Sequence, residues 1–348
     1  MSAPVSSIQS IIVEQKLTVS FKFLLSLYAI IPLCLLVQLI DVSFLHDYLK
    51  NSLPSTPTHF LLFQILFGTP HILASAIVLV GNAEYRKFYK RNIIGFTFLV
   101  AVVFGVGSLF IPYKVFYVLV AAWTVYHVIK QQHGVARGVC RLPNWAYHLL
   151  LALSIAAGLF IYIGIFLKNS LEAHEVALIK LAVSSLCTCM ILTAIYCLRL
   201  ISTKMGQWFL WANVLLVVSS FYFYVQQYYF LAILVPRLVH DATAYVFYVT
   251  HDFNRHHQRP QNFLYRYATQ FNINIFLVLP LSSFALAFVL QAYGDLWVSL
   301  ITQLFFGVEI HKVITVGLLG YFALLHYYTE AITWKLGSPY RNYIGFSD

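Results

Sequence analysis

Four histidines with mainly apolar neighbours are the residues of this chain best suited to carry out chemistry. They are His71, His127, His240 and His326. An imidazole in hydrocarbon is costly unless it faces other helices and finds a partner there. Neutral imidazole is also a common ligand of iron, copper and zinc. Four histidines on four separate helices therefore predict a polar site inside a helical bundle, most simply a metal or haem site.

Charged residues stand at helical spacing beside these histidines. His326 and Glu330 are four residues apart, so their side chains share one helix face and could bind the same ion. Arg237, His240 and Asp241 lie within about one turn of each other. The predicted metal ligands are His71, His127, His240, His326 and Glu330. The residues predicted to orient these ligands or to transfer protons are Lys130, Arg237 and Asp241.

A second polar layer is expected nearer one end of the same helices. It consists of His133, His251, Asp252 and His256. His240 and His251 are three turns apart, roughly 16 Å along a straight helix, so they cannot bind the same metal. The second layer could hold another metal, form a proton path or lie at a wet surface. The simpler interpretation of His251 and His256 is that they are surface residues.

The composition indicates which elements must position these side chains. The chain has 348 residues, of which 60% are hydrophobic and 10% are charged, whereas soluble domains carry about 25% charged residues. We therefore predict a single all-α domain over residues 1–348, a polytopic transmembrane bundle. A span needs about 20 mostly apolar residues. The qualifying runs lie near 21–40, 58–80, 93–111, 113–133, 145–167, 177–199, 208–228, 230–251, 272–291 and 312–334.

Basic residues predict how these ten spans are oriented. With the N-terminus inside, the inner segments hold 16 Lys and Arg and the outer segments hold 5. This bias predicts that both termini are cytoplasmic, and we expect no cleaved signal peptide. The net charge of +10 is then explained by the inner loops, so nucleic acid is not an expected partner. The expected location is an integral, multi-pass one, with a bacterial inner membrane as the working assumption.

The same topology places the four histidines at one level of the bilayer. At 1.5 Å per residue, His71, His127, His240 and His326 lie about 13, 9, 16 and 12 Å from the inner ends of their spans. One common layer in the cytoplasmic half accommodates all four. The histidines expected at the outer face, as ordinary surface residues, are His46, His59, His174 and His311.

Two short stretches are similar to a known family. Gly68-Thr69-Pro70-His71 matches the Gly-x-Pro-His of an early family signature, and residues 247–256 resemble an aromatic span that ends in His-Ser-x-Arg-His. The family is that of the bacterial Brp/Blh-type β-carotene 15,15'-dioxygenases. Residues 72–75 lack the Gly and Asp of the signature, and His251 and His256 are five residues apart rather than four.

This resemblance implies a polytopic non-haem iron oxygenase that acts on a long apolar substrate. It also implies that His71, His251 and His256 are metal ligands. The depth of the residues in the bilayer favours His240 over His251 for the central site, so the two lines of reasoning predict different ligand sets.

Three functions are compatible with the sequence. The leading hypothesis is a membrane metalloenzyme, a non-haem iron oxygenase or oxidoreductase that takes a lipid or isoprenoid from the bilayer and works with a redox partner. Zinc or copper would suit the same donors. The second hypothesis is a b-type haem protein with two axial histidines. The third is a proton-coupled secondary transporter, since buried charged residues and the prolines Pro70 and Pro236 are typical of such proteins.

Overall fold

The computed structural model of the chain describes residues 16–55 and 68–347. These residues form helices almost throughout, which confirms the all-α prediction apart from two short strands. His59, the first part of the predicted span 58–80 and the N-terminal segment that bears on a signal peptide lie outside the described residues.

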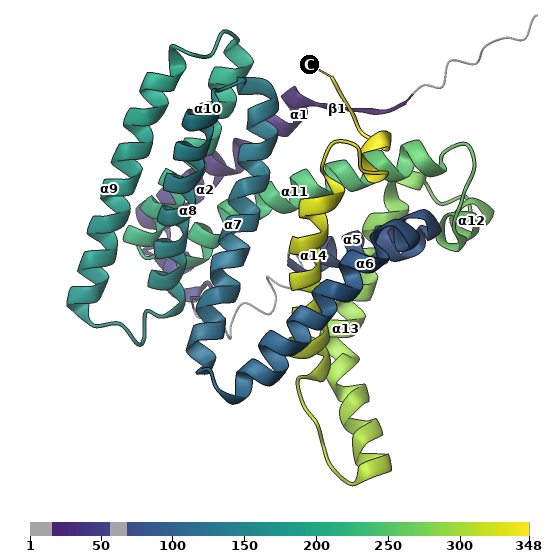
Figure 1. Cartoon of the computed structure of the whole chain (residues 1–348). Helices are drawn as coiled ribbons and strands as arrows, with labels where there is room; N and C mark the ends of the chain where they lie inside the picture. The colour runs from purple at the N-terminus through teal and green to yellow at the C-terminus, as the bar shows by residue number, and fades with distance from the viewer. Residues whose placement is uncertain (1–15, 56–67, 348) are drawn as a thin grey trace, which may run out of the picture.

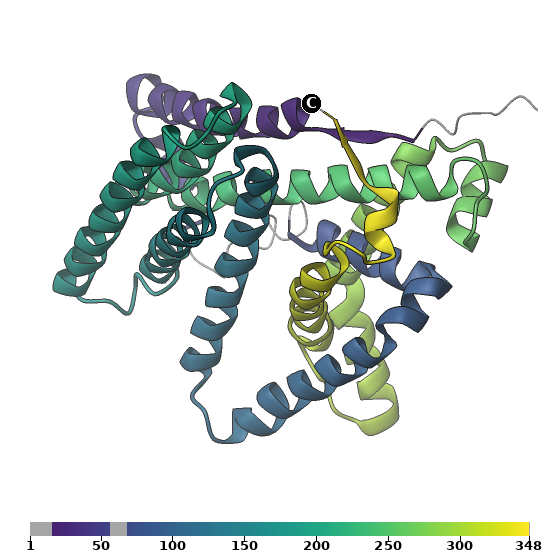
Figure 2. The same ribbon diagram turned by 45° about the horizontal axis from the view of Figure 1, so that its top comes forward.

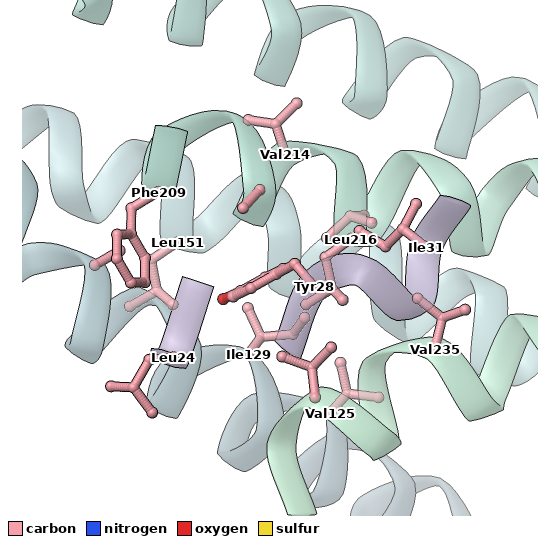
Figure 3. Packing of buried hydrophobic residues seen from close by; sticks show 14 of the residues in the cluster. Leu24, Tyr28, Ile31, Val125, Ile129, Leu151, Phe209, Val214, Leu216 and Val235 are labelled. Carbon is pink, nitrogen blue, oxygen red and sulfur yellow. The ribbon is translucent and has the colours of Figure 1, made fainter. Parts of the chain in front are cut away.

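One group of helices forms an antiparallel bundle (Figure 1). Its members are α1 (Phe21–Ser26), η1 (Leu27–Ala29), α2 (Ile30–Phe44), α7 (Tyr113–Cys140), α8 (Asn144–Phe166), α9 (Ala173–Leu198) and α10 (Lys204–Val225). The short helix α3 (Tyr48–Ser52) follows α2. Figure 3 shows Tyr28, Ile129 and Phe209 meeting in the core of this bundle, all of them buried. Burial of such large apolar side chains is the main force that holds the group together.

A second group of helices lies on the other side of α7 (Figure 1). It contains α5 (Thr69–Gly81), α6 (Ala83–Val100), η4 (Ala101–Val106), η5 (Gly107–Leu109), α13 (Ile275–Phe306), η6 (Val313–Leu318) and α14 (Leu319–Thr333). Helix α5 packs against both α13 and α14, and α14 also packs against α6. The second group thereby brings α5 and α14 next to each other.

Helix α11 (Tyr229–His256) joins the two groups. It packs against α10, α7 and α2 on one side and against α5 and α13 on the other, and Figure 2 shows it crossing the whole molecule. Because both groups cover it, 18 of its 28 residues are buried. Polar side chains on this helix must therefore find partners inside the protein.

The two ends of the described chain lie side by side. Strand β1 (Thr18–Ser20) pairs in parallel with β2 (Gly345–Ser347), and the 3₁₀ turn η7 (Tyr340–Tyr343) precedes β2. The Asn254 side chain on α11 accepts a hydrogen bond from the Leu17 amide at 2.7 Å and donates one to the Tyr343 carbonyl at 2.7 Å. Both ends are thus tied to the same end of α11.

Seven helices are long and apolar enough to cross a membrane. They lie at Phe21–Phe44, Ala83–Leu109, Asn144–Phe166, Ala173–Leu198, Lys204–Val225, Tyr229–His256 and Ile275–Phe306. The predicted turn near 226–227 is present, and Gln227 adopts a left-handed conformation with φ of 67°. The predicted end of the span 272–291 is wrong. Helix α13 continues to Phe306, because no glycine in a left-handed conformation stops it before Gly307, where φ is +67°.

The stretch between the predicted spans 230–251 and 272–291 is also more helical than expected. Helix α11 runs on to His256, and α12 (Phe263–Gln270) follows after a short connection. Asn262 caps α12 by accepting a hydrogen bond from the Tyr265 amide at 3.1 Å, which fixes where this helix begins.

Candidate metal centre

The four histidines of apolar helices meet at the centre of the molecule. His71 comes from α5, His127 from α7, His240 from α11 and His326 from α14. The ring centroids of His71 and His326 are 4.7 Å apart, and those of His127 and His240 are 4.9 Å apart. All four imidazoles are buried. The structure therefore brings together the residues that were expected to share one depth.

Glu330 belongs to the same cluster. Its Oε2 lies 3.2 Å from Nε2 of His127 and 3.9 Å from Nε2 of His326. The carboxylate is buried, so it does not reach Lys335 or Arg341 at the helix end as a surface ion pair would. All five predicted ligands therefore occupy one site.

Donor atoms in this cluster form two groups of three. The first is His71, His240 and His326, and the second is His127, His326 and Glu330; within each group the donor atoms lie within 4.8 Å of one another. Ligands bound about 2.1 Å from a metal lie about 3.0–4.2 Å apart, so each group needs only a small contraction around an ion. The Nε2 atoms of His71 and His326 are already 3.1 Å apart.

His326 is common to both groups and limits how many ions the cluster holds. Its Nδ1 lies 2.8 Å from Ser75 Oγ, and Ser75 in turn donates to the Ile72 carbonyl. The Nδ1 proton is thus held by Ser75, and one lone pair remains on Nε2. Because that lone pair serves one ion, both groups cannot be complete around two ions at once. The geometry fits a single ion.

His240 is the residue whose environment most needs a ligand. Its side chain is fully buried, and neither ring nitrogen has a hydrogen-bond partner among the described residues. Buried polar atoms are nearly always paired, because desolvation without a partner is costly. A metal ion bound at one ring nitrogen would satisfy this histidine, so the donor set fits an ion.

Asp241 and Arg237 support the cluster from outside. Asp241 Oδ1 lies 3.1 Å from His71 Nδ1 and 3.3 Å from Arg237 Nε. The carboxylate therefore holds the proton of His71 on Nδ1 and turns the Nε2 lone pair toward His326. Arg237 balances the charge of the carboxylate inside the protein. Both residues have the orienting role that the sequence predicted.

Replacing Asp241 by asparagine is expected to weaken metal binding by about 10–100-fold, as removal of such outer partners commonly does. Asp252→Asn is the matched control, because Asp252 is also a buried carboxylate on α11 but bonds His251 instead. Retention of metal against a graded chelator series would be compared. Equal losses in the two variants would contradict the assigned role of Asp241.

Sequence reasoning missed three polar residues that touch the cluster. Tyr248 donates a hydrogen bond to Glu330 Oε1, Gln131 Nε2 donates to Glu330 Oε2 at 3.4 Å, and Ser75 holds His326. A usable signal was present. Ser75 and Gln131 each follow a cluster histidine by four residues, and Tyr248 follows one by eight, so each shares a helix face with a predicted ligand.

The second polar layer forms a separate hydrogen-bonded network. His251 Nδ1 lies 2.7 Å from Asp252 Oδ1, and its Nε2 lies 2.6 Å from the Tyr85 hydroxyl. Tyr265 donates to the other oxygen of Asp252. Burial raises the pKa of Tyr265, and the Asp252 carboxylate raises that pKa further, so the phenol keeps its proton and remains a donor.

His251 and His256 are therefore buried, and their interpretation as surface residues is wrong. His256 Nδ1 accepts a hydrogen bond from the Gln261 amide at 3.2 Å, and its ring stacks on Tyr265. The sequence suggested exposure because a basic stretch follows α11, whereas α12 and η7 fold back over these side chains. Both nitrogens of His251 are occupied by protein groups, so it does not join the central cluster.

His133 and Lys130 also lie apart from the cluster. His133 is buried and its Nε2 lies 3.1 Å from Ser154 Oγ, so it is held by α8. Lys130 is exposed, and its Nζ donates to the Tyr126 hydroxyl at 2.6 Å. The structure thus does not place Lys130 against the predicted ligands.

A large cavity leads from the cluster to the surface between α7 and α14. Its volume is about 1190 Å³, and its walls include His127 and Glu330 at one end and the exposed Lys335 and Leu336 at the other. Ten of its 23 lining residues are Phe, Tyr or Trp. Among the five clustered residues, only His127 and Glu330 face this cavity. It can hold a bulky apolar molecule next to them.

Comparisons with known proteins leave the site to be interpreted from its own geometry. No protein-family model, curated protein or solved structure matches this chain.

Proposed function

We propose that the protein is a membrane-embedded metalloenzyme, a non-haem iron oxygenase or oxidoreductase that acts on an apolar lipid or isoprenoid. One observation carries this proposal. His127, His326 and Glu330 form a two-histidine, one-carboxylate set of donors, and His127 and Glu330 also line the aromatic cavity. Such a set with open positions is typical of non-haem Fe(II) oxygenases.

The proposal divides the cluster into roles. His127, His326 and Glu330 would hold the metal on the side of the cavity, and His71 and His240 would complete or support the set. Iron bound there would supply the activation of dioxygen. Tyr248 fixes one carboxylate oxygen of Glu330, and the apolar walls of the cavity exclude water and orient a substrate chain. A redox partner would supply electrons at the cytoplasmic face.

The geometry supports a haem group less well. The imidazoles pack edge to face, with ring centroids 4.7–5.1 Å apart for four of their pairs, which leaves no room for a macrocycle between them. The adjoining cavity reaches only His127 among the four histidines. A carboxylate and the Arg237–Asp241 pair are also not needed for axial haem ligation.

The proposal includes ten membrane spans with both termini cytoplasmic. The pairing of β1 with β2 places the two described ends of the chain on one side of the molecule, as an even number of spans requires. Helices α5, α7 and α14 would be the additional spans. The cluster would then lie within the cytoplasmic half of the bilayer.

Metal analysis of detergent-purified protein that has met no chelator tests this function. We expect about one iron per chain, because the donor geometry fits one ion, and no Soret band. Zinc or copper would keep the site and redirect the chemistry. A Soret band with stoichiometric haem would favour the b-type alternative, and protein without metal would leave a proton-coupled transporter as the better explanation.

A further inference from the structure

We propose that the substrate is an amphiphile whose apolar chain occupies the aromatic cavity and whose anionic end group binds four cationic side chains around it. This inference rests on the proposed function and deepens it by naming the substrate class. The four side chains are those of Lys130, Arg137, Lys335 and Arg341.

The charge balance of the cavity is the first support. Lys130, Arg137, Lys335 and Arg341 all line it, and the single acidic residue in its lining is Glu330, which belongs to the metal cluster. Among the described residues, none of the four cations forms an ion pair with a carboxylate. Four cations gathered without counter-charges attract an anion, and low-dielectric walls strengthen that attraction.

The two arginines are already held in place. Arg137 donates to Asn144 Oδ1 at 2.8 Å and lies 4.7 Å from the ring of Tyr147. Arg341 donates to the Ile344 carbonyl at 2.7 Å and lies 4.6 Å from the ring of Phe346. Side chains that are held before binding lose little entropy when an anion arrives. These contacts leave other guanidinium N–H groups free for a carboxylate or a phosphate.

The positions of the cations along α7 set the scale of the molecule. Lys130 is three residues from His127 and Arg137 is ten, which places them about 4.5 and 15 Å farther along the helix axis. An anionic group near Arg137 would thus leave a long apolar chain lying past the aromatic walls toward His127 and Glu330. A neutral hydrocarbon would gain nothing from the four cations.

Binding of cis-parinaric acid, a fluorescent long-chain carboxylate, tests the inference, with its neutral methyl ester as the comparison. The full-length protein in a detergent with an uncharged head group would be used. We expect the acid to bind at least about tenfold more tightly than the ester, since a hydrogen bond to a charged group contributes about that much. Dodecanoate, dodecyl phosphate and dodecanol as competitors would identify the preferred end group.

Two sets of variants locate the binding. Lys130→Gln together with Lys335→Gln should weaken the acid about tenfold and leave the ester unchanged, while Lys90→Gln with Lys204→Gln, two exposed lysines elsewhere, should change neither. Gly134→Phe should weaken both ligands by filling the cavity, because a Cβ at Gly134 meets no atom within 4 Å. Gly95→Phe, equally open but outside the cavity, is its control.

Metal content measured on the same samples separates the two proposals. Equal affinities for acid and ester in iron-containing protein, or acid binding unaffected by Lys130→Gln with Lys335→Gln, would overturn the amphiphile and leave the metalloenzyme standing. Selective binding of the acid by protein that lacks metal would overturn the metalloenzyme and leave an anion-selective lipid site.

Discussion

Replacing His240 by alanine is expected to remove the bound metal and all metal-dependent activity. His240 is fully buried, and neither of its ring nitrogens has a hydrogen-bond partner among the described residues. No protein interaction would therefore be lost except with the ion and the packed rings of His71 and His127. Iron per chain should fall from about one to background, measured by mass spectrometry of the purified variant.

His251→Ala is the matched control for this variant. His251 is equally buried on the same helix, but its nitrogens bond Tyr85 and Asp252, so its loss should lower thermal stability and leave the iron in place. The pair also tests the ligands implied by the resemblance to the carotene dioxygenases. Loss of iron in His251→Ala and its retention in His240→Ala would reverse the assignment.

Replacing Glu330 by glutamine is expected to have the second large effect. The change keeps the size of the side chain and removes the only carboxylate among the clustered residues. A neutral amide is a poorer ligand and leaves the ion without a compensating charge in a buried site. We expect the loss of iron affinity to exceed the 10–100-fold that outer partners contribute, and turnover of any substrate in the cavity should stop.

Asp41→Asn separates this effect from general damage. Asp41 is also a fully buried carboxylate, and it accepts hydrogen bonds from the Leu49 amide at 2.8 Å and the Tyr228 hydroxyl at 2.8 Å. Its replacement should reduce stability far from the cluster while the iron content stays at that of the wild type. If Glu330→Gln kept its iron under the same chelator challenge, Glu330 would not be a ligand.

Local sequence patterns predicted most helices because the patterns themselves decide where a helix runs. Long apolar runs, the turn at Pro112 and the glutamines 226–227 divide the chain where the helices divide. The errors arose where no local signal marks a boundary. Helix α13 extends past its predicted end, and α12 forms inside a polar stretch because Asn262 caps it and Tyr265 packs into the protein.

The convergence of the five clustered residues was predictable for a physical reason. A membrane span fixes depth by residue count, and the cost of an imidazole in hydrocarbon turns it toward other helices. Depth and inward direction together bring side chains from different helices to one place. Asp241 followed from its sequence position next to His240, and Tyr248, Ser75 and Gln131 shared helix faces with the histidines.

The second layer shows where such reasoning fails. His251, Asp252 and His256 follow the same helical spacing as the central residues, yet they belong to a closed network with Tyr85 and Tyr265. Their partners come from segments that are distant in the sequence and return over the end of α11. Spacing along one helix carries no information about such returns, so the burial of these residues could not be predicted.

The sequence alone thus determined the helical class, the depth of the four histidines and the pairing of His326 with Glu330 on one face. Only the tertiary structure decided that His326 is shared by two groups of donors, that His240 has no protein partner, and that a cavity with cationic side chains ends at His127 and Glu330. The reason is that local periodicity fixes the direction of a side chain relative to its own helix, whereas the packing of α5, α7, α11 and α14 fixes what it meets.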